Sequence, residues 1–78
     1  MITVKVRLDS VEKVKEFSSV ISRVDAECEL IEGVHILDAK SIMGIFSLNL
    51  AEPIQLDIHS DDRKILDRLK DFIVAEEA

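Results

Sequence analysis

Serine and histidine are the residue types in this sequence that suit phosphoryl chemistry. Ser41 follows Lys40 and precedes an apolar run, and Ser10 follows Asp9 in a similar setting. Both serines stand where a helix N-cap is expected. A phosphate on Ser41 would lie at a helix start, where backbone N–H groups and the helix dipole favour negative charge. Ser41 is therefore either a simple cap or a regulated hydroxyl, while Ser10 is interpreted as a cap.

The remaining reactive side chains predict no catalytic centre. His35 lies in a short strand pattern and His59 near the end of another, and neither begins a predicted helix beside a basic residue. Cys28 alternates with strand residues and has no second cysteine, which favours a buried thiol. Metal-ligand spacing, a phosphate-binding glycine loop and a nucleophile–base pair are not found. The sequence predicts no enzyme, no metal and no cofactor.

Length and charge limit the classes of function. The chain has 78 residues, which predicts one domain over 1–78 with a small core. The formal net charge of −6 disfavours nucleic acid, whose phosphates select clustered Lys and Arg. No apolar run approaches the length of about 20 residues that spans a bilayer, and no signal peptide is recognised. We expect a cytoplasmic protein without a membrane partner.

Hydrophobic periodicity predicts the element order βαββαβα. Strands are expected over 2–8, 26–30, 34–38 and 54–59, and helices over 11–23, 41–48 and from Ser60 onward with the apolar stripe Ile65, Leu69, Phe72 and Ile73. Residues 75–78 are expected to be a solvated end. Whether Ile36 or Leu37 faces inward is left open. Strands that are apolar on one face predict an α+β fold, an open-faced β-sandwich with helices on one side.

Residues 40–50 differ from an ordinary core helix. At about 100° per residue, their apolar side chains fall into two clusters. One contains Ile42, Met43 and Phe46, the other contains Ile45 and Leu48, and Gly44 and Ser47 separate them. A short helix has room to bury one cluster against a sheet, which leaves the other as an exposed patch, the kind of surface that binds partners. The alternative is that neighbouring loops cover both clusters.

The run Lys40-Ser41-Ile42-Met43-Gly44-Ile45-Phe46-Ser47-Leu48 resembles the regulatory-serine segment of HPr, the phosphocarrier of the bacterial sugar phosphotransferase system. The order of elements fits that family over nearly the whole chain. The resemblance implies a four-stranded sheet with three helices on one face. It implies that Ser41 is phosphorylated by a dedicated ATP-dependent kinase, as in many Gram-positive bacteria. It also implies that Ile45 and Leu48 face inward, and that Lys40, Ile42, Met43 and Phe46 form a docking surface for enzyme I, the kinase and transcriptional regulators.

The chain departs from HPr before its first predicted helix. HPr carries its phosphoryl group on the histidine of a Gly-Ile-His-Ala-Arg-Pro loop, whereas Asp9-Ser10 here leads into Val11-Glu12-Lys13-Val14. About three positions are absent, with the histidine, arginine and proline, and Glu12 would repel a phosphate. The chain is thus similar to the catabolite-repression HPr-like proteins, which keep the serine and lack the histidine. Those proteins retain the loop, and its shortening puts enzyme I docking in doubt.

These features predict a non-catalytic regulatory or interaction protein, switched by phosphorylation of Ser41 and bound by an HPr kinase or a transcriptional regulator. One alternative is a phosphocarrier that relays a phosphoryl group through an unconventional residue such as His35 or His59. Another is an assembly or scaffold protein that has lost the family's surface. The sequence does not name a sugar or an oligomeric state.

Overall fold

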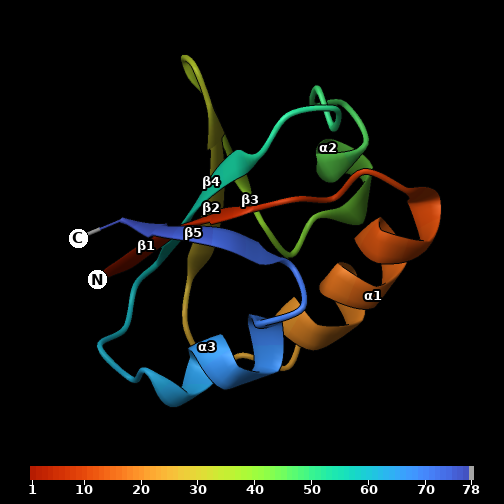
Figure 1. Cartoon of the computed structure of the whole chain (residues 1–78). Coiled ribbons are helices and arrows are strands. Elements are labelled where there is room, and N and C mark those ends of the chain that lie inside the picture. Colours follow the sequence, from red (N-terminus) through yellow and green to blue (C-terminus); the bar gives the residue numbers. More distant parts are fainter. Residues whose placement is uncertain (78) are drawn as a thin grey trace.

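A computed structural model describes residues 1–77, and Figure 1 shows how its elements are arranged. In chain order they are β1 (Ile2–Val6), α1 (Val11–Ile21), β2 (Cys28–Glu32), β3 (His35–Asp38), α2 (Ile42–Ile45), β4 (Ile54–Ile58), α3 (Lys64–Leu69) and β5 (Ile73–Glu77). The strands form one sheet in the order β3-β2-β4-β1-β5, and all pairs are antiparallel. The three helices lie on one face of this sheet (Figure 1).

The core lies between that face and the helices. Alternate strand residues point into it: Ile2, Val4, Val6, Cys28, Leu30, Ile54, Leu56 and Ile58. Helix α1 contributes Val14, Phe17 and Ile21 at three- and four-residue spacing. Phe17 also packs edge-to-face on Phe72, with 5.6 Å between ring centroids. The α+β class and the one-sided burial predicted from the period-two patterns are therefore confirmed.

The sheet has five strands, so the prediction of a four-stranded sheet is wrong. The last helix ends at Leu69. Phe72 and Ile73, which the sequence predicts in its apolar stripe, lie beyond the end of the helix. Phe72 donates its N–H to the Leu69 carbonyl at 2.9 Å, and Arg7 donates its N–H to the Phe72 carbonyl at 2.8 Å. Ile73 then begins β5, which pairs with β1. The expected solvated end is thus strand through Glu77, and Ala78 lies outside the described residues.

The outer edge of β1 explains this difference. Strand β1 pairs with β4 on one side, and its other side would present unpaired N–H and C=O groups without β5. Pairing with β5 provides hydrogen bonds for several backbone groups of β1 at once. A longer α3 would form hydrogen bonds only within the helix and would leave this edge of β1 unpaired. Because β1 and β5 are separated by nearly the whole chain, the local apolar period of residues 65–73 carries no sign of the pairing.

All three helices are shorter than expected, α1 by its last two residues and the other two by more. Ser60 does not cap α3: its Oγ accepts from the Asp62 N–H at 3.0 Å, and Asp62 Oδ1 accepts from the Lys64 N–H at 3.0 Å. These local side-chain bonds compete with helix, which begins only at Lys64. Helix α2 ends at Ile45, and the chain continues in a tight turn in which Leu48 donates its N–H to the Ile45 carbonyl at 3.1 Å.

Candidate functional site

Ser41 forms the N-cap of α2. Its backbone is extended, its Oγ accepts a hydrogen bond from the Gly44 N–H at 3.4 Å, and the residue is exposed. The first turn of α2 contains no acidic residue. An esterified Oγ would retain lone pairs for the Gly44 N–H, so a phosphate fits without removing the cap. The helix has four residues, and its dipole therefore contributes less to such a phosphate than a full-length helix would.

Helix α2 separates its apolar side chains as the sequence predicts, except that Ile42, predicted in the exposed cluster, packs partly against the core. Ile45 is fully buried and Leu48 is 9% exposed, which confirms that this cluster faces inward. Met43 is 80% exposed and Phe46 is 42% exposed, while Ile42 is half-buried against the core. We call Met43, Phe46 and the exposed part of Ile42 the α2 patch. The patch lies close to the exposed Ser41 hydroxyl, because Ser41 is the N-cap and Phe46 the C-cap of the same one-turn helix.

Lys40 and Gly44 fix the position of α2. Lys40 donates its N–H to Asp38 Oδ1 at 2.9 Å and its Nζ to the Val24 carbonyl at 2.8 Å, which joins the end of β3 to the segment after α1. A Cβ on Gly44 would lie 3.4 Å from both Leu37 Cδ1 and Ser41 Oγ, an ordinary contact distance, so α2 lies close to β3 at this residue. The Lys40 cation is thus tied to the main chain.

The start of α1 is built differently. Ser10 is an exposed N-cap whose Oγ accepts from the Lys13 N–H at 3.1 Å. Asp9 forms an ion pair with Lys13 at 3.5 Å, and Glu12 lies in the first turn. A negative group therefore already occupies this helix start. A phosphate on Ser10 would lie near two carboxylates and one lysine, an unfavourable arrangement.

The two histidines belong to the sheet and to the segment that follows it, and neither is a cap or a first-turn residue of α1 or α2. His35 is exposed in β3. His59 follows β4, and its Nε2 lies 2.7 Å from Glu29 Oε1. Neither imidazole is next to a helix N-terminus.

Cys28 lies in β2 with its side chain in the core, 2% exposed. Burial raises the pKa of the thiol, the nearby Lys40 cation opposes this shift, and Asp38 adds to it. Because the thiolate is the reactive form, a raised pKa makes this cysteine a poor nucleophile at neutral pH. The buried thiol expected from the sequence is confirmed.

The apolar surface of the β2–β3 hairpin was not singled out from the sequence. Leu37 faces inward opposite Leu30, whereas Ile36 is 63% exposed and lies opposite Ile31 on the open face. The available signal was the pairing itself: two strands joined by a Glu32-Gly33 turn place Leu30 opposite Leu37, and Leu30 belongs to the inward set. Gly33 makes this turn with φ of 60°, in the left-handed region.

Within residues 1–77, no group of three or more His, Cys, Asp or Glu side chains is arranged to hold a metal ion. None of the helices in that same range is both long and apolar enough to cross a membrane.

Comparison with known proteins gives one informative result. No family model matches the sequence, and no curated protein matches it. Among solved structures, the chain is similar to the crystal structure of HPr-C-His from Thermoanaerobacter tengcongensis. The two share 23% sequence identity and a TM-score of 0.70, with 88% of this chain and 84% of that chain covered. The sheet with helices on one face described above is therefore an HPr-like fold.

Proposed function

We propose that this protein is a non-catalytic regulatory protein of the bacterial phosphotransferase system, which binds partners through the α2 patch and is switched by phosphorylation of Ser41. One observation carries the proposal: an exposed capping hydroxyl lies beside exposed Met43 and Phe46, while Ile45 and Leu48 beneath them are buried. Exposed apolar groups of this kind are typical of partner sites. The protein acts in the cytoplasm, with an HPr kinase or a transcriptional regulator as partner.

The switch acts through charge. Phosphorylation adds about −1.5 to −2 charges next to an apolar surface, and the first turn of α2 holds no carboxylate to oppose it. The added phosphate oxygens offer acceptors to an arginine or lysine of a partner that already contacts Met43 and Phe46. A partner that needs both contacts binds only the modified form.

Incubation with a bacterial HPr kinase and ATP, followed by peptide mass spectrometry, tests the switch. We expect one phosphate, on Ser41, and none on Ser10. The Ser10→Ala variant should be modified like the wild type, and the Ser41→Ala variant should stay unmodified. Absence of phosphate on Ser41 under conditions that modify a genuine HPr would refute the switch and leave the fold assignment intact.

The same kinase tests the patch. The double variant Met43→Ala, Phe46→Ala should raise the KM for the protein at least about thirtyfold, because truncation of anchor side chains at an interface weakens binding by more than about 1 kcal/mol each. Val11→Ala is the matched control, since Val11 is 58% exposed at the other helix start. An equal effect of both changes would contradict docking through the α2 patch.

Phosphoenolpyruvate, enzyme I and labelled phosphate test the competing role as a phosphocarrier. We expect no acid-labile label, since His35 lies on a strand and His59 is paired with Glu29. Acid-labile label on either histidine would favour the phosphocarrier over the regulator.

A further inference from the structure

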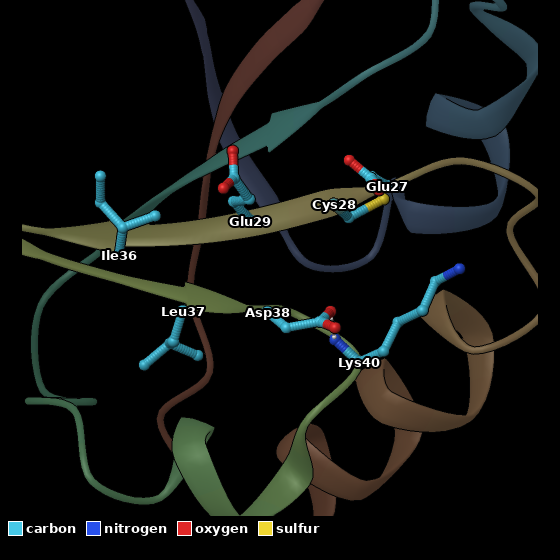
Figure 2. A pocket seen from close by; sticks show the side chains of 7 residues that line it. All are labelled: Glu27, Cys28, Glu29, Ile36, Leu37, Asp38 and Lys40. Atoms are coloured by element: carbon cyan, nitrogen blue, oxygen red, sulfur yellow. Dashed lines mark hydrogen bonds between the residues drawn. The ribbon is translucent and has the colours of Figure 1, made fainter.

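The β2–β3 hairpin carries two apolar side chains on the face of the sheet that is turned away from the core. Ile36 and Ile31 lie directly opposite each other, and Ile36 is 63% exposed. Figure 2 shows Leu37 directed toward the helical side, whereas Ile36 and Glu29 lie on the other side of the hairpin. Val34, at the turn, is 93% exposed. The open face of a one-sided sheet is normally polar, so this apolar surface needs a reason.

Strand β3 is also an edge of the sheet. In the order β3-β2-β4-β1-β5 it pairs with β2 alone, and one side of its backbone has no neighbouring strand among residues 1–77. Edge strands present N–H and C=O groups to any extended chain, and proteins often protect them with proline or lysine. The β3 sequence His-Ile-Leu-Asp contains neither. With four residues, β3 can pair with a short extended segment at this edge.

Three carboxylates lie near the end of β3 that contains Asp38. A hollow of about 290 Å³ is lined by Glu27, Glu29 and Asp38 together with Ile36 and Leu37 (Figure 2). Lys40 also borders it, but its Nζ donates to the Val24 carbonyl, and Figure 2 shows the side chain running away from Ile36. His59 pairs with Glu29 at 2.7 Å. The hollow is thus lined by three carboxylates and one lysine cation, so it is acidic on balance.

The spacing along β3 defines what fits. Ile36 and Asp38 are two residues apart on the same face, about 7 Å along the strand. A strand added beside β3 would place its own residues i and i+2 next to them. We infer that the β3 edge binds an extended, basic segment of another protein, with an apolar side chain beside Ile36 and a lysine or arginine two positions away beside Asp38.

Charge argues against a second copy of this chain as the occupant. The protein has a formal net charge of −6, so two copies repel each other at long range. An antiparallel pair of β3 strands centred on Ile36 would place Val34 of one copy opposite Asp38 of the other. The carboxylates would then meet an apolar side chain and gain no cation. A basic segment satisfies both the apolar pair and the acidic hollow.

Fluorescence polarisation with synthetic peptides tests the inference. The probe is a labelled nine-residue peptide in which isoleucine and lysine alternate on one face and threonine fills the other. We expect it to bind at least tenfold more tightly than the same peptide with glutamate in place of lysine, because the charges then oppose the hollow. Replacing the central threonine by proline should abolish binding, since proline removes a strand hydrogen bond. Binding should weaken several-fold between 0.05 and 0.5 M NaCl.

Surface variants of the full chain identify the site. The double variant Glu27→Gln, Asp38→Asn should weaken binding of the basic peptide about three- to tenfold. The asparagine Oδ1 keeps the acceptor for the Lys40 N–H, so the local turn is retained. Ile36→Thr should weaken binding to a similar degree. Val74→Thr is the matched control, because Val74 is 50% exposed on β5, the other edge strand, and it should change nothing.

Amide chemical shifts complete the test. Titration with the basic peptide should move the amide resonances of β3 and the adjacent end of β2, and leave those of α2 in place. Equal binding of the acidic and basic peptides, shift changes centred on α2, or an equal loss with Val74→Thr would overturn the inference. So would concentration-dependent dimerisation that Ile36→Thr abolishes, because the occupant would then be a second copy.

Discussion

Two helices of this protein begin at an exposed serine that caps the helix. The residues around the two serines differ in charge and in exposed apolar surface. Ser10 accepts from the Lys13 N–H at 3.1 Å, and Ser41 accepts from the Gly44 N–H at 3.4 Å. The α1 start is charged, with Glu12 in the first turn and the Asp9–Lys13 ion pair. The α2 start is uncharged in its first turn and is followed by exposed Met43 and Phe46.

The difference shows that a serine cap acquires a function from its surroundings. At α1, eleven helical residues depend on the cap, and nearby carboxylates already occupy the positive end of the helix. At α2, four helical residues depend on it, the first turn holds no carboxylate, and the nearest one in the sequence, Asp38, accepts from the Lys40 N–H before the cap. Ser10 is therefore suited to stabilising a helix, and Ser41 is suited to being modified. Four measurements of folding stability test this difference.

The largest effect is expected beneath the α2 patch. Ile45→Ala should lower the free energy of unfolding by about 2–5 kcal/mol, because Ile45 is fully buried and a cavity would remain. Met43→Ala, on the other side of the same helix, should change it by less than about 0.5 kcal/mol. Urea denaturation monitored by circular dichroism measures both. Similar values for the two variants would show that α2 does not separate a core side from a free side.

The second largest effect is expected from removing the two serine caps. Ser10→Ala should cost about 1 kcal/mol, a usual value for loss of an N-cap. Ser41→Ala should cost less, because its hydrogen bond is longer and its helix is only one turn. The same urea titration applies to both. A greater loss at Ser41 would mean that this serine is held chiefly for stability.

Aspartate at each cap tests the charge difference. Aspartate caps a helix about as well as serine does, so the cap is retained in both variants. Ser10→Asp adds a charge near Asp9 and Glu12 and should be about 0.5 kcal/mol less stable than Ser41→Asp. In 0.5 M NaCl the gap should shrink, because salt screens exposed charges. A gap of the opposite sign would contradict the electrostatic account of Ser41.

The smallest effect concerns the ion pair at α1. Lys13→Gln should lower stability by about 0.3 kcal/mol, since it removes an exposed i,i+4 pair with Asp9. The loss should disappear at high salt. Lys15→Gln on the same helix serves as the control for a change of net charge. If both variants lose the same amount, the pair contributes nothing specific to the α1 start.

Much of the site was predictable, because helical periodicity is local. The spacing of Ile42, Ile45 and Phe46 sorted the apolar side chains of α2 into two clusters, and the resemblance to HPr indicated which cluster is inside. The half-burial of Ile42 was not predictable, since it depends on how closely α2 lies against β3. The length of α2 was also overestimated, because the tight turn after Ile45 leaves no local sequence signal.

Elements with a local pattern could be predicted from the sequence: the alternating strand β1, the amphipathic helix α1, and the serine caps at Ser10 and Ser41. Whether Phe72 and Ile73 join a helix or a strand depends on tertiary contacts. A short apolar run suits a helix stripe or a strand equally well, and the choice depends on the unpaired edge of β1, almost a chain length away. The same holds for Ile36, which reaches solvent because β3 pairs with β2 in a register that turns Leu37 inward. Local periodicity is fixed by neighbouring residues, whereas strand pairing is fixed by partners that neighbouring residues do not reveal.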